Sequence, residues 1–547
     1  MTLHADLLIE NSRPLSRGVR QGQSASIAIR DERIVAVGPA AEVADLAGPG
    51  TRRLDAGQNS VIPGIIDSHC HADRHAVRLQ RWIDVSPGNV PDRSALIDRL
   101  RRALAEPPSD TAPGKPGWIA AYRFDDQRSG GYPDIAELDA VSRDIPIIVM
   151  RTDNHLAVVN TAAFERLGLQ PDVVDPPFGR FDREPGTGRL TGLVREAAMQ
   201  MFVEEVQADD LVEDFETGLQ MVYADWLRYG MTSIQNSLTG SKPMRAMQNL
   251  RMRDGLRIRT GIIASGREAG LVESLIDSAI QSGLGDDWLR LIGVEWCPDC
   301  STSGRTAAYY DPYVGTPVSG EPVPNTGMLL YEAEDLNARA AAAHAAGLQV
   351  MIEGVGDRGI DFALDAIEHA LTLTPRADHR MRVEHCCYVT PAIEARLKAL
   401  EVICSSATGF MYELGGAYLR NRGGPAMARM WPHRSMIDAG IPAPGHSDAM
   451  IVGPNPFEAI WSMVNRKSLS GHDLDTSQSV SLAEAIDAYT WLGAYAGREE
   501  TVKGSLEAGK LADVAILDRD IEACDPLALR DVVVQQTLVG GKVVHTT

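Results

Sequence analysis

Two histidines, His69 and His71, follow the apolar run Val61–Ile66, and their spacing suits metal binding. Side chains two residues apart on an extended strand point to the same face, so both imidazoles can reach one metal ion. Barrel enzymes also place their chemistry where a buried strand ends. The pair therefore favours a metal site over two incidental histidines at a strand end.

Three more side chains that can bind metal end predicted strands further along the chain. Glu353 follows the predicted strand Leu348–Ile352, His385 ends Met381–His385, and Asp448 ends a segment that starts near residue 441. The carboxyl ends of parallel strands meet at one face of a barrel. Convergence of five such side chains at one face makes the metal-site interpretation much stronger than the histidine pair alone.

Predicted helices alternate with these strands. Ala-rich Glu332–Ala346 precedes one strand, amphipathic Ile360–Leu373 precedes the next, and Ala392–Leu400 leads to a strand at Val402–Ser405. Strand–helix alternation implies a parallel sheet, and this many units favours an α/β fold of the (β/α)₈ TIM barrel type.

Both ends of the chain read as short strands. Ser26–Arg30 and Ile34–Gly38 flank a turn and predict a hairpin, and Ala512–Leu517 is likewise a short, mostly apolar run that predicts a strand. We therefore expect one small sheet domain built from both termini. Residues 80–210 are rich in Pro, Gly and Asp and do not fit the alternation, so we interpret them as an insertion after the first barrel strand that covers the site.

The composition excludes several classes of partner. A net charge of −21 argues against nucleic acid and anionic membranes. No apolar run reaches the roughly 18 residues of a membrane span, and the first residues lack a signal-peptide pattern. Seven cysteines, an odd number, are typical of reduced thiols in a cytoplasmic protein. Cys297 and Cys300 have C-x-x-C spacing but no second pair, so we interpret them as buried or bystander thiols, with a redox or zinc role as the alternative.

Short motifs along nearly the whole chain match those of a known family. They are Pro63–Gly64 through His71, Asp153–Asn154–His155 with Asn160, Tyr229–Gly230–Met231–Thr232–Ser233, Gly304–Arg305–Thr306–Ala307, Gly356–Asp357–Arg358, Glu384–His385, Ser447–Asp448 and Gly504–Ser505 through Asp513. In number and order they resemble the amidohydrolase superfamily, and in particular its family 3 branch.

The resemblance implies a fold and a set of metal ligands. The fold is a distorted (β/α)₈ barrel, residues 63–489, with a small β-sandwich made from residues 1–62 and 490–547. His69 and His71 correspond to the ligands of the first strand, His385 to the histidine of the sixth and Asp448 to the aspartate of the eighth. The implied cofactor is one or two divalent metal ions, with zinc expected and manganese or iron as alternatives.

Two positions depart from the family pattern. Glu295, at the end of the predicted strand Leu291–Glu295, stands where many relatives carry a bridging lysine that becomes carboxylated. Glu353 stands where relatives commonly carry a histidine. A carboxylate can bridge two metals or bind zinc, and its hardness and charge favour iron or manganese more than imidazole does. The number of metals therefore stays open at one or two.

The predicted activity is metal-assisted hydrolysis of a non-peptide C–N bond in a linear amide, an N-substituted formamide or a carbamate. Asp448 is the predicted catalytic base. Alternatives are a cyclic amidase, an esterase or a deaminase on the same barrel, or a metal-binding protein without turnover. The expected partner is a small-molecule substrate, and a homodimer is the default assembly.

Three further residues are candidates for binding the substrate. His155 either reaches in from the insertion or is a packed histidine. Arg305 either binds a substrate carbonyl or carboxylate or forms a structural salt bridge. His446 shares a strand face with Asp448, so ligand, substrate and core roles are open.

Overall fold

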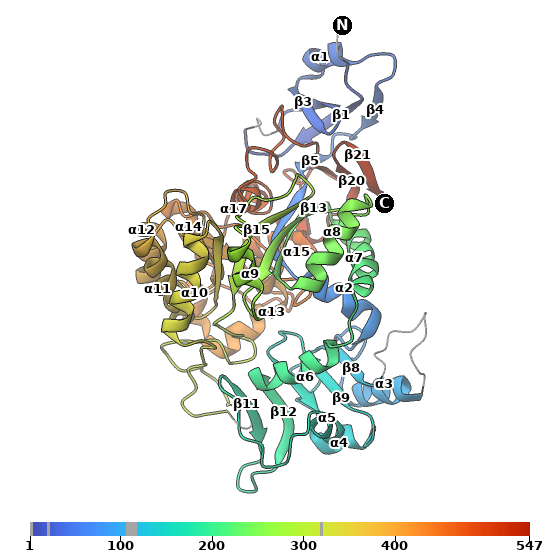
Figure 1. Cartoon of the computed structure of the whole chain (residues 1–547). Helices are drawn as coiled ribbons and strands as arrows, with labels where there is room; N and C mark the ends of the chain where they lie inside the picture. Colours follow the sequence, from blue (N-terminus) through green and yellow to red (C-terminus); the bar gives the residue numbers. More distant parts are fainter. Residues whose placement is uncertain (1–3, 19–21, 106–116, 318–320) are drawn as a thin grey trace.

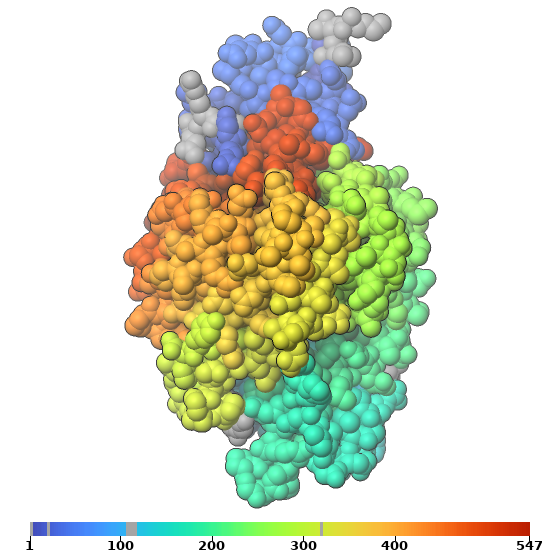
Figure 2. Space-filling view, turned by 60° about the vertical axis from the view of Figure 1, so that its left-hand side comes forward, coloured from blue at the N-terminus to red at the C-terminus, as the bar shows by residue number. Residues whose placement is uncertain are grey.

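The computed structural model describes residues 4–18, 22–105, 117–317 and 321–547. Figure 1 shows a mixed α/β chain in three parts: a sheet made by the two termini at one end, a parallel barrel in the middle, and a second α/β unit at the other end. The space-filling view in Figure 2 shows the same sequence of parts, with the barrel helices forming the broad middle.

Seven parallel strands form the barrel sheet, in the order β18–β17–β16–β15–β14–β13–β6. They are β6 (Ile65–Cys70), β13 (Met231–Thr239), β14 (Arg259–Ser265), β15 (Leu289–Trp296), β16 (Gln349–Gly354), β17 (Arg382–His385) and β18 (Ile403–Ser406). Most of their residues are buried on both faces, as expected for a parallel sheet covered by helices. The predicted parallel barrel is confirmed in this nearly closed form.

Residues 442–449 occupy the eighth position, next to β18 and β6, but they are not a regular strand. The N–H of Ser406 donates to the carbonyl of Pro444 at 2.9 Å, and the N–H of Asp448 donates to the carbonyl of His69 at 3.0 Å. Pro442 and Pro444 have no N–H, so this segment cannot form a full ladder with both neighbours. The prediction of an eighth strand before Asp448 is therefore corrected to an irregular extended segment that closes the barrel.

The chain termini form one eight-stranded sheet, in the order β21–β20–β19–β5–β1–β2–β3, with β4 paired to β1. The strands are β1 (Leu7–Pro14), β2 (Ala25–Arg30), β3 (Arg33–Gly38), β4 (Arg52–Asp55), β5 (Ser60–Pro63), β19 (Val514–Leu517), β20 (Val534–Val539) and β21 (Lys542–Thr546). The predicted hairpin is β2–β3, with antiparallel pairing. The strands make a single hydrogen-bonded path, and the expected two-layer sandwich stays a prediction.

A separate six-stranded sheet lies between β6 and β13 along the chain, in the order β11–β12–β10–β9–β8–β7. Its strands are β7 (Ile83–Asp84), β8 (Ile119–Phe124), β9 (Ile147–Arg151), β10 (Leu156–Val159), β11 (Gly179–Arg183) and β12 (Leu190–Glu196), and its helices are α3 (Arg93–Ala105), α4 (Ile135–Asp139), α5 (Thr161–Arg166) and α6 (Ala197–Gln207). Residues 106–116 of the expected insertion lie outside the described residues.

The turn between β9 and β10 brings this inserted unit against the barrel loops. Arg151 Nη1 donates to Ser303 Oγ at 3.0 Å, and Thr152 Oγ1 donates to the carbonyl of Ile451 at 3.1 Å. Ser303 follows β15, and Ile451 follows the eighth position. The inserted unit therefore packs on the end of the barrel where the candidate side chains lie, opposite the terminal sheet (Figure 1).

Helices surround the barrel. They are α2 (Ala72–Arg81), α7 (Val212–Trp226), α8 (Ser241–Met252), α9 (Leu271–Asp277), α10 (Ala333–Ala345), α11 (Asp357–Leu373), α12 (Pro391–Ala399), α13 (Thr408–Arg422), α14 (His433–Ala439), α15 (Pro456–Asn465), α16 (Leu482–Ala488) and α17 (Trp491–Ala496). In α11 the buried residues Ile360, Ala363, Leu364 and Ile367 repeat at helical spacing and face the core. Within the described ranges, no helix has both the length and the apolar character needed to cross a membrane.

Candidate metal centre

His69, His71 and Asp448 form one side of a buried cluster. Asp448 Oδ1 lies 3.0 Å from His71 Nε2 and 3.5 Å from His69 Nε2. The ligand-capable atoms of the three residues all lie within 4.8 Å of one another. His69 of β6, His71 just after it and Asp448 of the eighth segment therefore meet as the sequence predicted.

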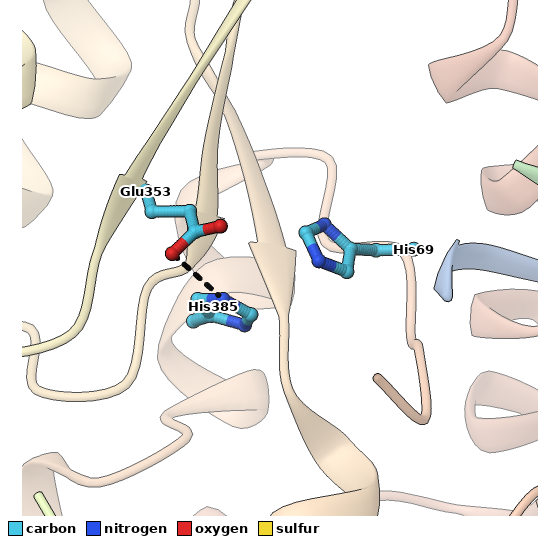
Figure 3. A group of neighbouring side chains, drawn as sticks. All are labelled: His69, Glu353 and His385. Atoms are coloured by element: carbon cyan, nitrogen blue, oxygen red, sulfur yellow. Dashed lines mark ion pairs between the residues drawn. The ribbon is translucent and has the colours of Figure 1, made fainter. Parts of the chain in front are cut away.

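Glu353 and His385 form the other side and share His69 with the first. Figure 3 shows Glu353 and His385 at the ends of neighbouring strands, β16 and β17, with the His69 ring facing them. Glu353 Oε2 lies 3.6 Å from His385 Nε2, and these two residues and His69 again offer atoms within 4.8 Å of one another. Phe410 of α13 stacks on the His385 ring, with centroids 5.7 Å apart, and helps to fix its orientation.

Glu295 joins this cluster through His69. Its Oε1 lies 3.6 Å from His69 Nδ1, and its Oε2 accepts a hydrogen bond from the Ser237 hydroxyl. The side chain is fully buried, and burial raises the pKa of Glu295 to about 7. The other five predicted ligands thus lie around His69, which belongs to both groups of neighbouring side chains.

Two of the candidate ligand residues have a left-handed backbone conformation. His385 has φ 65° and Asp448 has φ 57°, a region that non-glycine residues rarely adopt. Such strain persists where surrounding structure enforces it and is common at functional sites. At His385 it also breaks the strand alternation, so that Glu384 and His385 both reach the centre instead of pointing to opposite faces.

Glu384 is a contact that the sequence analysis did not predict. Its Oε2 lies 3.1 Å from His69 Nδ1, and its Oε1 accepts from Arg382 Nε at 2.5 Å. Burial alone would raise the pKa of Glu384, but the Arg382 guanidinium and His69 hold it below its usual range. A carboxylate on Nδ1 fixes the ring and leaves Nε2 for a metal ion. The sequence feature that could have revealed this contact is a glutamate directly before the predicted ligand His385 and two residues after Arg382.

The residues present fit a bound cation. Four buried atoms have no hydrogen-bond partner among the described residues, namely His69 Nε2, His385 Nδ1, Glu295 Oε1 and Asp448 Oδ1. Each unpartnered buried polar atom costs about 1–3 kcal/mol. Imidazole nitrogens and carboxylate oxygens together are the donor set of zinc, iron and manganese sites. A divalent metal ion would satisfy these atoms.

His446 lies beside the same cluster. It is fully buried, and its ring centroid is 4.9 Å from that of His69 and 5.2 Å from that of His385. Neither ring nitrogen has a hydrogen-bond partner within the described part of the chain. Burial, reinforced by the neighbouring histidines, lowers the pKa of His446 well below its usual value, so the ring is neutral.

His155 lies at the edge of the site, on the turn after β9. Its Nδ1 is 2.8 Å from Glu196 Oε2, and its side chain is 18% exposed. Burial alone would lower the pKa of His155, but the Glu196 carboxylate outweighs it and raises the pKa to about 9. His155 and Glu196 also line a cavity of about 170 Å³.

Arg305 does not reach this cluster through any of its hydrogen bonds. Its guanidinium pairs with Glu321 at 2.7 Å and donates to the carbonyl of Val314 and to Asn421 Oδ1. These contacts favour the structural salt bridge over a substrate contact, the two alternatives that the sequence left open.

Cys297 is closer to the chemistry than its prediction as a bystander thiol. Its Sγ donates to Glu353 Oε2 at 2.6 Å and accepts from Arg267 Nη2 at 2.7 Å. Cys297 also lines the cavity that His155 borders. Cys300, by contrast, lies near His155 and Glu196, and the atoms of these three residues fall within 4.8 Å of one another.

Comparison with known proteins agrees with this geometry. The sequence pattern of the amidohydrolase family matches residues 52–545. The chain belongs to the amidohydrolase family. The predicted family is thereby confirmed, and with it the prediction of a metal-dependent amidohydrolase, an enzyme that hydrolyses C–N bonds.

Individual amidohydrolases resemble this chain over nearly its whole length. N-substituted formamide deformylase of Arthrobacter pascens is 25% identical over 99% of this chain and 98% of its own. The putative amidohydrolase YtcJ of Bacillus subtilis is 24% identical over 91% of each. A metal-dependent hydrolase of Pyrococcus horikoshii, whose function is uncharacterised, has the same fold, with a TM-score of 0.73 at 23% identity over 98% of this chain and 100% of its own.

Proposed function

We propose that this amidohydrolase cleaves a non-peptide C–N bond in a linear amide, an N-substituted formamide or a carbamate. The observation that carries the proposal is the position of Asp448, whose Oδ1 lies 3.0 Å from His71 Nε2 and 3.5 Å from His69 Nε2. The similarity to an N-substituted formamide deformylase along the full chain supports this substrate class.

The proposed ligands are His69, His71, Glu295, Glu353, His385 and Asp448. His69 has only Nε2 to offer, because its Nδ1 faces Glu384. It therefore serves one ion, with His71 and Asp448. Glu353 and His385 would hold a second ion, and Glu295, whose Oε1 lies 3.6 Å from His69 Nδ1, is proposed as a further ligand. We propose zinc in these positions, with manganese or iron as alternatives because three of the ligands are carboxylates.

A divalent metal bound here would lower the pKa of its coordinated water towards about 7 and would polarise the carbonyl group of the substrate. Asp448 accepts a proton from the attacking water, and its position against His69 and His71 keeps it ionised. Burial alone would raise the pKa of Asp448, but these histidines hold it well below its usual value. The carboxyl group then delivers the proton to the leaving amine.

Two histidines are placed to hold the substrate: His446, which is neutral, and His155, which is protonated. His446 is neutral, so one ring nitrogen carries a proton that can be donated to the substrate carbonyl oxygen. His155 borders the cavity from the inserted unit and presents Nε2, because Nδ1 is paired with Glu196. Arg305 is left out of the substrate contacts.

The cellular location, the domain boundaries and the assembly are also proposals. We propose a cytoplasmic location, because all seven cysteines are free thiols. We also propose that residues 63–489 form the catalytic domain, that residues 80–210 are an insertion in it, and that residues 1–62 with 490–547 form the accessory domain. A homodimer is the proposed assembly.

The test is a substrate panel with metal-reconstituted protein. Formanilides, N-acyl arylamines and aryl carbamates are compared with cyclic imides, aryl esters and aminopurines, before and after chelation and metal return. The proposal expects hydrolysis of the linear C–N substrates that chelation abolishes and zinc or manganese restores. Turnover confined to esters, cyclic imides or aminopurines would overturn it, as would metal uptake with no hydrolysis of any substrate.

A further inference from the structure

A cavity of about 170 Å³ lies next to the candidate metal centre, between the inserted unit and the barrel loops. His155, Glu196 and Met199 come from the inserted unit, and Arg267 and Cys297 come from the loops after β14 and β15. The thiol of Cys297 touches both Arg267, at 2.7 Å, and Glu353, at 2.6 Å. Cys297 in the cavity wall is therefore in direct contact with a proposed metal ligand.

Arg267 is an unpaired cation on this wall. Its guanidinium has five N–H donors, and among the described residues only the contact to Cys297 Sγ uses one of them. It forms no ion pair with a carboxylate in the described ranges, although the chain carries a net charge of −21. The side chain is exposed, and it lines the cavity.

The carboxylates around the cavity already have other partners. Glu196 is paired with His155 at 2.8 Å, and Glu353 accepts from the Cys297 thiol and is a proposed metal ligand. Burial alone would lower the pKa of Arg267, and nearby Cys297, Glu353 and Glu196 raise it, but within the described ranges neither glutamate forms an ion pair with the guanidinium, which therefore keeps free donors. His155 is itself close enough to Arg267 for the two positive charges to oppose each other. An anion between the two would remove this repulsion and use the free N–H groups of both.

Apart from Asn154 and Gln200, the rest of the wall is mostly apolar. Phe178, Met199, Leu330 and Tyr331 line the same cavity. A wall with a few convergent polar groups on an otherwise apolar surface is typical of a small-molecule site. The combination suits an aromatic or aliphatic group that carries a carboxylate.

We propose that this cavity binds a carboxylate of the substrate through Arg267 and His155, so that the enzyme acts on amides with an anionic group a few bonds from the scissile C–N bond. The proposal rests on the proposed function for the place of the scissile bond, but the binding of the carboxylate can be measured without turnover. The planar guanidinium matches a carboxylate with two parallel hydrogen bonds, which a neutral carboxamide cannot accept equally.

The experiment uses benzoate and its neutral analogue benzamide as probes, with isothermal titration calorimetry on the metal-loaded protein. Wild type is expected to bind benzoate more tightly than benzamide. Arg267→Met is expected to weaken benzoate at least about tenfold and to change benzamide less than about twofold, since a hydrogen bond to a charged group contributes about that much. Arg245→Met, which removes the same charge from the exposed face of α8, is the matched control and is expected to bind both probes as wild type does.

A second arm separates the cavity from the metal. If benzoate binds only to the metal, its binding is lost after chelation and kept in Arg267→Met. If benzoate binds in the cavity, its binding is kept after chelation and weakened in Arg267→Met. Equal affinity of wild type for the two probes, or unchanged benzoate affinity in a folded Arg267→Met, would overturn the proposal. Absence of any hydrolysis would instead count against the proposed function, because it leaves the binding result intact.

If turnover is found, matched substrates test the inference in the reaction itself. N-acyl-2-aminobenzoates are expected to have a higher kcat/KM than N-acyl-2-aminobenzamides, and Arg267→Met is expected to remove the difference through KM. A preference for the neutral series in wild type would contradict the proposal.

Discussion

The candidate metal centre has two halves that differ in the types of their side chains and in the strands that supply them. The histidine half consists of His69, His71 and Asp448 and comes from β6 and the irregular eighth segment. The carboxylate half consists of Glu295, Glu353 and His385 and comes from β15, β16 and β17. By the resemblance to the family we propose that the histidine half keeps the usual ligands, whereas the carboxylate half carries Glu295 and Glu353 in place of a lysine and a histidine.

The supporting contacts differ in the same way. In the histidine half, Glu384 and Arg382 hold His69 through buried charged hydrogen bonds. In the carboxylate half, Glu353 is held by a thiol, Cys297, that also carries a cavity arginine. We therefore propose that the histidine half is the anchor for a metal ion, and that the carboxylate half connects the metal centre to the proposed substrate cavity.

The largest effect is expected from Asp448→Asn, which keeps the shape of the histidine half but removes its proton acceptor. We expect kcat to fall by about 10²–10⁴, the range of general acid–base catalysis, with metal still bound. Steady-state kinetics with parallel metal analysis measures this. Asp335→Asn, on the exposed face of α10, is the control. Near-wild-type turnover in the metal-loaded Asp448→Asn protein would remove Asp448 from the mechanism.

The next effect concerns the anchor itself. Glu384→Gln keeps a hydrogen-bond acceptor near His69 but removes the charge, and we expect metal affinity to fall about 10–100-fold, as for other partners of ligand histidines. Competition with a chromophoric chelator measures the affinity, and thermal unfolding of the variant shows whether buried Arg382 still permits folding. An unchanged affinity in a folded variant would mean that Glu384 does not orient His69.

How much of this could be predicted from sequence depends on the kind of signal. His69, His71, His385 and Asp448 were found because strand ends of a barrel converge and because their types bind metals. Glu384 was missed because strict strand alternation places it on the opposite face from His385, and only the left-handed backbone at His385 changes that.

Other features depended on contacts between distant segments. Cys297, Arg267 and Glu353 are brought together by three different strand ends, and no spacing in the sequence records that meeting. The sequence correctly placed the segment before Asp448 at the eighth barrel position but wrongly predicted a regular strand there. Pro442 and Pro444 lack the N–H donors that a regular ladder needs. The fold class and the meeting of the main candidate ligands could thus be predicted from the sequence, and the supporting contacts could not.

A smaller effect extends the comparison to the cavity. Because Glu196 raises the pKa of His155 to about 9 from an ordinary value of 6.5, folding favours the protonated ring. The stabilisation is complete below about pH 6.5 and is lost as the pH rises through about 9. Denaturant unfolding at pH 6.5, 8 and 9.5 should therefore show a steeper loss of stability in wild type than in His155→Gln. Parallel curves for the two proteins would show that the Glu196 pair contributes nothing.

The smallest effect is expected from the thiol of the carboxylate half. Cys297→Ser keeps a donor to Glu353, so we expect metal affinity within about twofold of wild type, whereas Cys297→Ala removes the donor and should weaken it several-fold. Cys300→Ala, which removes a buried thiol beside His155 and Glu196, is the matched control. Equal affinities for the serine and alanine variants would show that the thiol does not position Glu353.

The measurement that tests the candidate metal centre most directly is the metal content of His69→Ala, because His69 is the proposed anchor of the ion in the histidine half. Inductively coupled plasma mass spectrometry gives the metal content per chain of wild type, His69→Ala and the surface control His369→Ala. We expect one or two divalent ions per chain in wild type and in His369→Ala, and at least one ion fewer per chain in a folded His69→Ala protein. Wild-type metal content in His69→Ala would contradict the proposed centre.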